Sequence, residues 1–290
     1  MARRRFCRSG RQSSLGPMHT DLRNKTALIT GASSGIGEAL ARELARRGAQ
    51  LVLLARRRDR LEQLASELAE GGCRVLFDEA DVARDGDIER AVDLAHAKLG
   101  PIDLVIANAG ISIGGQLARL SVADHRRQLE TNYFGVLRTF IATRDDLLAQ
   151  RGGFAVVGSV NGYFPLPGGG PYAVSKFAVR AFCDTLRMEM KPHGVSVTHI
   201  IPGFIATEFR KIDNQGRLHP DRKDAAPAWL QMPARRAAEE IADALTLRQA
   251  ECILTGHGKA AVWMQHFLPG ALEYLASRLG INASPPPRKG

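Results

Sequence analysis

The feature that most constrains the fold of this chain is a regular alternation of short apolar segments with longer amphipathic ones. The apolar segments have the length of buried strands and lie at residues 26–30, 51–54, 73–77, 103–107, 154–159, 195–201 and 251–254. Apolar residues recur at helical spacing at residues 36–47, 58–70, 85–99 and 121–150, and in a further helix that ends near residue 190. Such alternation predicts a parallel sheet covered by helices on both faces. We therefore expect an α/β protein, with one doubly wound domain and a seven-stranded parallel sheet.

A glycine-rich turn connects the first predicted strand to the first predicted helix. It has the spacing Gly31-x-x-x-Gly35-x-Gly37, with Ser33, Ser34 and Ile36 between the glycines. Glycines let the backbone approach a pyrophosphate, and the N-terminus of the following helix offers unpaired N–H groups and a positive dipole end. The spacing leaves one more residue in the turn than the G-x-G-x-x-G form does. Because it follows a strand and opens a helix, the turn has the context of a dinucleotide-binding site.

The end of the second predicted strand indicates which dinucleotide the chain binds. Sites for the non-phosphorylated cofactor usually place an acidic residue there for the ribose 2′-hydroxyl, whereas an arginine suits a 2′-phosphate. Here the strand is followed by Arg56, Arg57 and Arg58, and the next acidic residue is Asp59. A guanidinium can bind a phosphate through two parallel hydrogen bonds. We predict NADP as the cofactor, with Arg56 as the main phosphate contact and Arg57 or Ser34 assisting. A solvated basic helix start is the alternative.

Three side chains near the fifth predicted strand have the chemistry of a carbonyl-reducing site. We expect Ser159 at the carboxyl end of that strand, and Tyr172 and Lys176 on one face of the next helix, because they are four residues apart. An isolated tyrosine has a pKa of about 10, so it is a useful acid near neutral pH only if a cation stabilises its anion. Lys176 could supply this cation. Taken singly, each of the three residues could instead have a purely structural role.

With these residues placed, the sequence closely resembles the short-chain dehydrogenase/reductase family from Lys25 to about Leu254. The motifs that carry the resemblance occur in the family's order: Thr30-Gly31-x-x-x-Gly35-Ile36-Gly37, Asp81-Val82, Asn108-Ala109-Gly110, Asn132, Ser159, Tyr172-x-x-x-Lys176, and Pro202-Gly203 with Thr207 just beyond. Tyr-x-x-x-Lys alone would often occur by chance, but the whole set in one order is very specific. The resemblance implies a Rossmann-type fold and hydride transfer between C4 of a nicotinamide and a carbonyl carbon.

The resemblance also implies a role for each matched residue. Tyr172 would be the general acid in reduction and the base in oxidation, and Ser159 would hydrogen-bond the substrate oxygen. Lys176 would bind the nicotinamide ribose and lower the tyrosine pKa. Asn132 would anchor a water chain to Lys176, and Asp81 and Val82 would hold the adenine. The cofactor would be lined by Asn108, Ala109 and Gly110. The nicotinamide carboxamide would be bound by Pro202, Gly203, Ile205 and Thr207. Asn132 could instead merely cap or bend its helix.

The chain divides into three expected parts. Residues 1–22 form a basic leader, which we expect to be disordered, with Met18 as a candidate start; a nucleic-acid tail, an anionic-lipid tail and a transit-like segment are the alternatives. Residues 23–257 form the Rossmann-type domain, in which residues 204–233 are expected to be a substrate lid or a plain surface excursion. Residues 258–290 form a helical extension and tail.

Composition and cysteine spacing favour a reducing compartment. Cys7, Cys73, Cys183 and Cys252 are scattered without a metal-binding spacing, so we expect free thiols, no metal and a cytoplasmic protein. The leader lacks the apolar region of a secretory signal, and no apolar run is long enough to span a membrane. Contact with the inner face of a membrane would therefore be peripheral.

The extension bears on the substrate. Its apolar residues follow a broadly helical stripe: Val262, Trp263, Phe267, Leu268, Leu272, Leu275 and Leu279. Such a helix could cover an apolar substrate, lie at a membrane surface, pack against a second subunit or pack on its own core. The stripe is similar to the extensions of family members that act on lipids and steroids. This resemblance implies NADP(H)-dependent reduction of a hydrophobic or long-chain ketone, or the reverse oxidation of an alcohol.

Three alternative functions stay open at this point. Family members that reduce acyl-carrier-protein thioesters typically end in an Asp-Gly-Gly element, where this chain has Thr255-Gly256-His257-Gly258; a 3-oxoacyl thioester reductase is therefore the second choice. A non-catalytic module that senses NADP(H) and a peripheral membrane or nucleic-acid protein acting through the leader are the others. We expect a small-molecule substrate, a homo-oligomer (dimer or tetramer) and no nucleic-acid partner.

Overall fold

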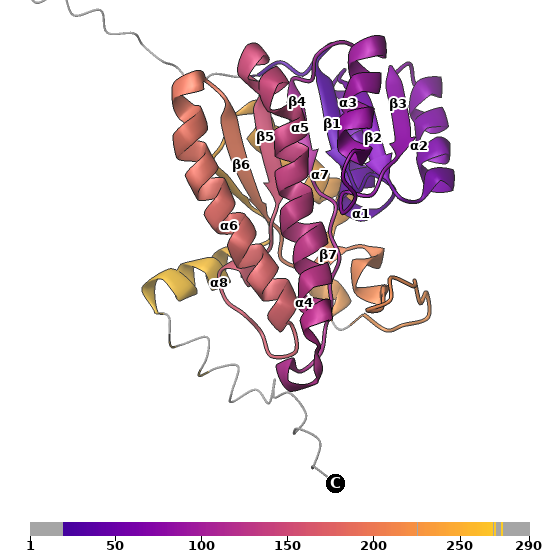
Figure 1. Ribbon diagram of the computed structural model, residues 1–290. Coiled ribbons are helices and arrows are strands. Elements are labelled where there is room, and N and C mark those ends of the chain that lie inside the picture. Colours follow the sequence, from indigo (N-terminus) through magenta and orange to yellow (C-terminus); the bar gives the residue numbers. More distant parts are fainter. Residues whose placement is uncertain (1–19, 225, 269, 271–273, 275–290) are drawn as a thin grey trace, which may run out of the picture.

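The computed structural model describes residues 20–224, 226–268, 270 and 274 (Figure 1). Most of the predicted basic leader, including Cys7 and Met18, lies outside the described residues, and so do Leu272, Leu275 and Leu279 of the predicted apolar stripe. Within the described part of the chain, no helix combines the length and the apolar character needed to cross a membrane.

One parallel sheet of seven strands forms the centre of the molecule, in the order β3-β2-β1-β4-β5-β6-β9 (Figure 1). The strands are β1 (Thr26–Thr30), β2 (Gln50–Ala55), β3 (Val75–Glu79), β4 (Leu104–Ala107), β5 (Gly153–Val157), β6 (Ser196–Ile201) and β9 (Glu251–Ile253). The predicted fold class is confirmed. The strand order reverses between β1 and β4, and open α/β sheets bind ligands outside the carboxyl ends of their strands at such a switch point.

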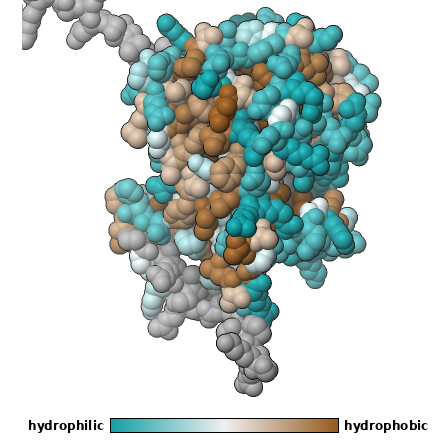
Figure 2. All heavy atoms as spheres, in the orientation of Figure 1, coloured by the Kyte–Doolittle hydropathy of each residue, from teal (hydrophilic) through white to brown (hydrophobic). Residues whose placement is uncertain are grey.

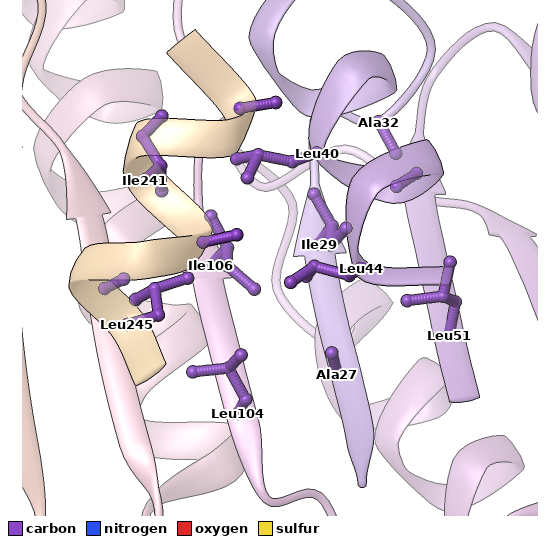
Figure 3. Packing of buried hydrophobic residues seen from close by; sticks show 14 of the residues in the cluster. Ala27, Ile29, Ala32, Leu40, Leu44, Leu51, Leu104, Ile106, Ile241 and Leu245 are labelled. Atoms are coloured by element: carbon purple, nitrogen blue, oxygen red, sulfur yellow. The ribbon is translucent and has the colours of Figure 1, made fainter. Parts of the chain in front are cut away.

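Helices cover both faces of this sheet. One face carries α1 (Gly35–Arg46), α2 (Arg58–Glu70) and α7 (Ala234–Thr246), and the other carries α3 (Asp87–Lys98), α5 (Gly135–Gln150) and α6 (Gly170–Met190). Figure 3 shows Leu40 and Leu44 of α1 and Ile241 and Leu245 of α7 packed over Ile29 of β1 and the neighbouring strands. Successive side chains of a strand point to opposite faces, so Ile29 packs in this cluster whereas Leu28 packs with α3, α5 and α6. Both faces are therefore buried, which explains the nearly continuous apolar strands.

Several predicted element bounds differ from the structure, most of them by one or two residues. The third strand begins at Val75 rather than Cys73, because the Cys73 N–H still donates to the Leu68 carbonyl and closes α2. The long helix predicted at 121–150 is divided into α4 (Val122–Leu129), a π-helical turn (Glu130–Phe134) and α5. The fifth strand ends at Val157, two residues before Ser159.

The segment predicted as a lid carries a small second sheet. Strands β7 (Ile205–Ala206) and β8 (Met232–Pro233) pair in parallel, and a 3-10 turn (Glu208–Lys211) follows β7 directly. Helix α8 (Gly256–Phe267) begins the C-terminal extension. Among its described residues, Trp263, Phe267 and the following Leu268 are largely exposed.

Candidate active site

The glycine-rich turn lies between β1 and α1 and is held by backbone geometry. Gly31 and Gly35 adopt positive φ angles of 66° and 61°, which L side chains rarely adopt. A Cβ on Gly37 would lie 2.4 Å from the Gly31 carbonyl oxygen, so only glycine fits there. Helix α1 begins at Gly35 with no side-chain cap on its first N–H groups. These N–H groups, at the positive end of the helix dipole, suit the pyrophosphate of a dinucleotide.

Asn108 fastens this turn to the end of β4. Its Nδ2 donates to the carbonyl oxygens of Thr30 (2.9 Å) and Gly31 (3.1 Å). In return, the N–H groups of Asn108 and Ala109 both donate to the Thr30 hydroxyl (3.0 and 3.1 Å). Asn108 therefore fixes the two strand ends that border the switch point, and Ala109 and the following Gly110 lie at the same edge.

The serines of the turn are bound by an arginine from the end of β2. Arg57 donates to the hydroxyl oxygens of Ser33 (3.1 Å) and Ser34 (2.6 Å). Its pKa is lowered, first by burial and then by the charge of nearby Arg60. Arg56, which the sequence favoured as the main phosphate contact, is exposed. The side chain at the turn is thus Arg57, to which the sequence analysis gave an assisting part, and Arg60 was not predicted at all.

The predicted catalytic side chains converge beyond the end of β5. Ser159 is buried, and its hydroxyl accepts from the Asn161 N–H (3.1 Å) and is hydrogen-bonded to Tyr172. Lys176 lies one turn further along α6, with Nζ 5.6 Å from the centre of the Tyr172 ring. The Lys176 ammonium is buried and donates to the Val157 carbonyl at the end of β5 (2.7 Å). Tyr172, Lys176 and Ser159 therefore lie together beyond the end of β5, and their catalytic roles stay a prediction.

Burial shifts the pKa values of both titrating groups of this cluster. The pKa of Tyr172 is raised by burial, while the hydrogen bond with Ser159 and the positive charge of Arg210 act to lower it. Burial lowers the pKa of Lys176 to about 8. Sequence reasoning missed Arg210, because it reaches Tyr172 from the segment after β7. The expectation that Lys176 itself lowers the tyrosine pKa stays a prediction.

Asn132 occupies the π-helical turn between α4 and α5 and is fully buried. Its Oδ1 accepts from the Ile111 N–H (2.9 Å), and its Nδ2 donates to the Ile111 carbonyl (3.1 Å) and to the Ser175 hydroxyl (3.0 Å). Gln128, one turn earlier, binds the same segment through the Ile111 carbonyl (2.8 Å). Asn132 thus joins the segment after β4 to α6 beside Lys176. Gln128 was missed, although its spacing of four from Asn132 is a usable signal.

The predicted adenine residues lie just after β3. The Asp81 N–H donates to Asp87 (2.8 Å), and the Asp81 carboxylate accepts from the Ala83 N–H (3.0 Å). Val82 is buried against Gly135, where an added Cβ would lie 2.6 Å from a Val82 methyl group. Both residues therefore adjoin the carboxyl end of the sheet, on the side of β2 and β3.

The predicted carboxamide residues connect β6 to the lid segment. Ile205 is buried, and the Pro202 carbonyl accepts from the Val160 N–H (3.1 Å). The Thr207 methyl group faces Gly35, where an added Cβ would lie 3.2 Å away, so this segment reaches back to the glycine turn.

His257 of α8 packs against the next part of the same connection. A Cβ on Gly203 would lie 2.5 Å from its Nε2, so any larger residue would require this ring to shift. The imidazole accepts from the Phe204 N–H (3.2 Å) and stacks on the Phe204 ring, with centroids 5.3 Å apart.

A cavity of about 700 Å³ lies between the segment after β4 and the lid segment. It is bordered by Ser112, Gly114, Gly115, Phe209, Arg210, Ile212, Asp213, Asn214, Gln215, Arg222 and Lys223. The Phe209 ring lies 6.0 Å from the Tyr172 ring, which connects the cavity to the candidate catalytic cluster. Asn214 joins the two walls, since its amide exchanges hydrogen bonds with the Gly114 N–H (3.0 Å) and carbonyl (2.8 Å). Among the described residues, no cluster of three or more His, Cys, Asp or Glu side chains could hold a metal ion.

Comparison with curated proteins finds relatives along most of the chain. A glycine betaine reductase of Emericella nidulans is 38% identical over 201 residues, which are 69% of this chain but only 16% of that longer protein. The dehydrogenase/reductase SDR family member 7B of Bos taurus is 34% identical over 275 residues, covering 90% of this chain and 83% of that protein. The 11-beta-hydroxysteroid dehydrogenase A of Sesamum indicum is 31% identical over 272 residues, covering 91% and 78%.

Solved structures have the same architecture. An alcohol dehydrogenase of Thermococcus sibiricus, complexed with 5-hydroxy-NADP, superposes with a TM-score of 0.71 at 33% identity, covering 80% of this chain and 96% of that chain. A short chain dehydrogenase/reductase of Burkholderia phymatum in complex with NAD has a TM-score of 0.76 at 24% identity, covering 93% and 100%; this likeness concerns the fold. The model of the short chain dehydrogenase family matches residues 25–217, from β1 through the glycine turn and α6 into the lid segment. This chain therefore belongs to the short-chain dehydrogenase/reductase family of oxidoreductases, which bind a nicotinamide cofactor.

Proposed function

We propose that the protein is an NADP(H)-dependent oxidoreductase that transfers a hydride between the nicotinamide and a carbonyl or secondary alcohol of a hydrophobic, long-chain substrate. The observation that carries the proposal is the convergence of Ser159, Tyr172 and Lys176 at the carboxyl end of the sheet. Glycine positions with positive φ and an uncapped helix start fit the pyrophosphate at the neighbouring strand end.

Each of the three side chains has a distinct chemical task. The bound cofactor supplies or accepts the hydride. In reduction, the Tyr172 hydroxyl donates a proton to the substrate oxygen as negative charge develops there. Ser159, which already hydrogen-bonds Tyr172, donates to the same oxygen and orients the carbonyl. The Lys176 ammonium stabilises the phenolate that remains, and Asn132 fixes the α6 backbone region through Ser175.

The preference for NADP(H) rests on the arginines after β2. No acidic residue occupies the end of that strand, and the Arg57 guanidinium lies on the hydroxyl groups of Ser33 and Ser34. A 2′-phosphate beside these serines would meet Arg57 and Arg60, whereas Arg56 is the outermost of the three. We therefore assign the main contact to Arg57 and a peripheral one to Arg56.

The substrate class rests on the cavity and the extension. Phe209 and Ile212 border the cavity near Tyr172, and exposed Trp263 and Phe267 lie on α8. The relative from Sesamum indicum is named as a hydroxysteroid dehydrogenase, and its similarity extends over nine-tenths of this chain. These features favour a hydrophobic ketone over a thioester.

Self-association is part of the proposal. Exposed apolar residues lie on α5 and α6, among them Ile141, Val174, Phe177 and Met188, and Figure 2 shows apolar residues gathered over these helices. A patch of this kind suits the interface of a homo-oligomer. We place the protein in the cytoplasm, where its thiols stay reduced, with peripheral membrane contact through α8 as a further proposal.

Turnover of Tyr172→Phe tests the proposed reaction. Wild-type protein is screened with long-chain ketones, steroids, 3-oxoacyl thioesters and secondary alcohols against NADPH and NADH, followed at the nicotinamide absorbance. Tyr172→Phe should lower kcat by about 10²- to 10⁴-fold, the range for removal of a general acid, while cofactor binding is retained.

Tyr163→Phe is the matched control, because Tyr163 lies nearby but donates to Glu251 (2.8 Å) and has no part in the proposed chemistry. It should keep turnover within a few-fold. Unchanged turnover in Tyr172→Phe would contradict catalysis by this site. A preference for thioesters would replace the substrate class and keep the reaction.

A further inference from the structure

We propose that Glu208 occupies the place of the cofactor 2′-phosphate and must leave Arg57 and Arg60 when NADP(H) binds, so that this one carboxylate sets the balance between NADP(H) and NAD(H). The inference rests on the proposed NADP(H) preference and deepens it. It names a specificity-determining residue in a segment 148 residues away from Arg60 along the chain.

Three separate segments meet at this point. Arg57 and Arg60 come from the end of β2 and the start of α2, Ser33 and Ser34 come from the glycine turn, and Glu208 comes from the turn after β7. The Glu208 carboxylate lies 2.8 Å from Nη1 of Arg60 and 3.6 Å from Nη1 of Arg57. The arginine and glutamate side chains are all about one-third exposed, so a soluble anion can reach them.

The chemistry of the arginine pair is that of an anion site. Arg57 is already oriented by Ser33 and Ser34, and it lies near Arg60, since both guanidinium groups contact the Glu208 carboxylate. Two like charges this close repel each other, which also contributes to the lowered pKa of Arg57. An anion between them relieves this repulsion. A carboxylate supplies one negative charge, whereas a ribose 2′-phosphate supplies close to two and three acceptor oxygens, so it suits two guanidinium groups better.

Glu208 is held over the glycine turn by its neighbours. Thr207 caps the 3-10 turn that begins at Glu208, with its hydroxyl accepting from the Phe209 N–H (3.4 Å). The Thr207 methyl group faces Gly35 on the other side. The carboxylate is therefore presented to the arginines by a segment that itself borders the cofactor crevice. The depressed pKa of Glu208, caused first by its hydrogen bond with Arg60, keeps it ionised at neutral pH.

NADP(H) and NAD(H) should therefore affect the Glu208–Arg60 ion pair differently. The 2′-phosphate of NADP(H) cannot share the arginine pair with a second anion at contact distance, because like charges repel, so the Glu208–Arg60 ion pair has to open. The 2′-hydroxyl of NAD(H) can leave that pair intact and donate a hydrogen bond to the carboxylate. Glu208 thus supplies, from the lid segment, the acidic group that is missing at the end of β2.

Glu208→Gln tests the proposal in the full-length protein. Binding of 2′,5′-ADP and 5′-AMP is measured by calorimetry, and binding of NADPH and NADH by the change in their fluorescence. The substitution should tighten 2′,5′-ADP and NADPH by about three- to tenfold, in the range of one partly exposed ion pair and the loss of one like charge. Binding of 5′-AMP should stay within twofold, and NADH binding should stay unchanged or weaken.

Two further variants test whether the effect of Glu208→Gln on ligand binding is specific to the Glu208–Arg60 pair. Glu67→Gln removes a more exposed glutamate of α2 that pairs with Arg42 of α1 (2.7 Å), and it should change the binding of neither ligand. In Glu208→Gln/Arg60→Gln, the gain for 2′,5′-ADP should disappear, because Arg60 is the arginine that Glu208 releases. Persistence of the gain in this double variant would overturn the proposal.

The outcomes also separate this inference from the proposed function. If the wild type binds 2′,5′-ADP more tightly than 5′-AMP and Glu208→Gln leaves that ratio unchanged or lowers it, the Glu208 inference fails and the NADP(H) preference stands. If the wild type does not prefer 2′,5′-ADP but Glu208→Gln does, the inference stands and the natural preference is for NAD(H). If neither protein prefers 2′,5′-ADP, both proposals fail.

Discussion

The two sides of the candidate active site are built in different ways. On the cofactor side, the glycine turn is held by backbone conformation and by one amide, Asn108, which bonds the carbonyls of Thr30 and Gly31. On the substrate side, the walls are loops joined by side chains, such as Asn214 to Gly114 and Arg210 to Asp224 (2.6 Å). The first side tolerates almost no added atom, whereas the second encloses a cavity of about 700 Å³.

This difference separates cofactor binding, which the whole family shares, from substrate recognition, which can differ between its members. A pyrophosphate is the same in every nicotinamide cofactor, and backbone N–H groups bind it without depending on side-chain identity. A substrate must be distinguished from other carbonyl compounds, and loop side chains can be exchanged without disturbing the sheet. We therefore expect substitutions on the cofactor side to affect folding and cofactor binding together, and those on the substrate side to affect KM alone.

The largest effect is expected at Gly37. In Gly37→Ala, the new methyl group would lie 2.4 Å from the Gly31 carbonyl and 2.5 Å from Nδ2 of Asn108, so the turn must shift. We expect a loss of about 3 kcal/mol in the free energy of unfolding, the upper range for overpacking, together with loss of NADPH binding. Urea unfolding and fluorescence titration measure the two quantities. Gly256→Ala is the control, since a Cβ there meets nothing within 4 Å. Similar free energies of unfolding for both variants would contradict the proposed difference between the two sides of the site.

The next effect concerns pH and the Lys176 ammonium. Burial lowers its pKa to about 8, so the ammonium is lost as the pH rises through that value, and reduction should slow up to about tenfold per pH unit above it. The free energy of unfolding, in contrast, should rise with pH over the same range. Because the folded state binds fewer protons than the unfolded chain between pH 8 and the ordinary lysine value of about 10.4, this group makes the free energy of unfolding rise with pH there.

A pH–rate profile, with urea unfolding at the same pH values, checks both directions for Lys176. The pKa of Tyr172 is raised, so its own titration should appear at higher pH. Lys176→Arg keeps a cation at all these pH values and should lose the limb near pH 8. A limb that persists in this variant would assign the titration to another group.

The smallest effect is expected on the substrate side, at Asn214. Asn214→Ala removes two hydrogen bonds to Gly114 and should raise KM for the ketone by about three- to tenfold, since each partly exposed bond contributes on the order of 1 kcal/mol or less. The Kd for NADPH and the midpoint of unfolding should stay the same. Glu62→Ala, at an exposed position of α2 that does not border the cavity, should leave KM within twofold. A weakened cofactor affinity in Asn214→Ala would show that the two sides are not independent.

The sequence was sufficient for those features that depend on spacing and periodicity. Apolar runs predicted the strands, and the interval of four residues correctly placed Tyr172 and Lys176 one turn apart on α6. The glycine turn was recognised because it stands between a strand and a helix, and its positive φ angles at Gly31 and Gly35 agree with that assignment. These features are local, so they require no knowledge of the tertiary structure.

Features that depend on side-chain direction across loops could not be predicted in the same way. Three arginines follow β2, and only the short connection to α2 decides that Arg57 turns toward Ser33 and Ser34 while Arg56 faces solvent. Glu208 and Arg210 approach the site from a segment that has neither strand nor helix periodicity. The π-helical turn at Asn132 was also missed, since one extra residue barely alters a helical pattern.

The contact between His257 and Phe204 has a consequence for how this chain could diversify. The first turn of α8 and the first residue of the lid segment are joined through one imidazole ring, which packs against Gly203 in the place a side chain would take. We therefore expect a change in the position of the C-terminal helix to shift the first residue of the lid segment without moving Ser159, Tyr172 or Lys176. Exchange of the C-terminal segment between relatives is accordingly expected to alter the lid segment while the proposed catalytic side chains keep their places.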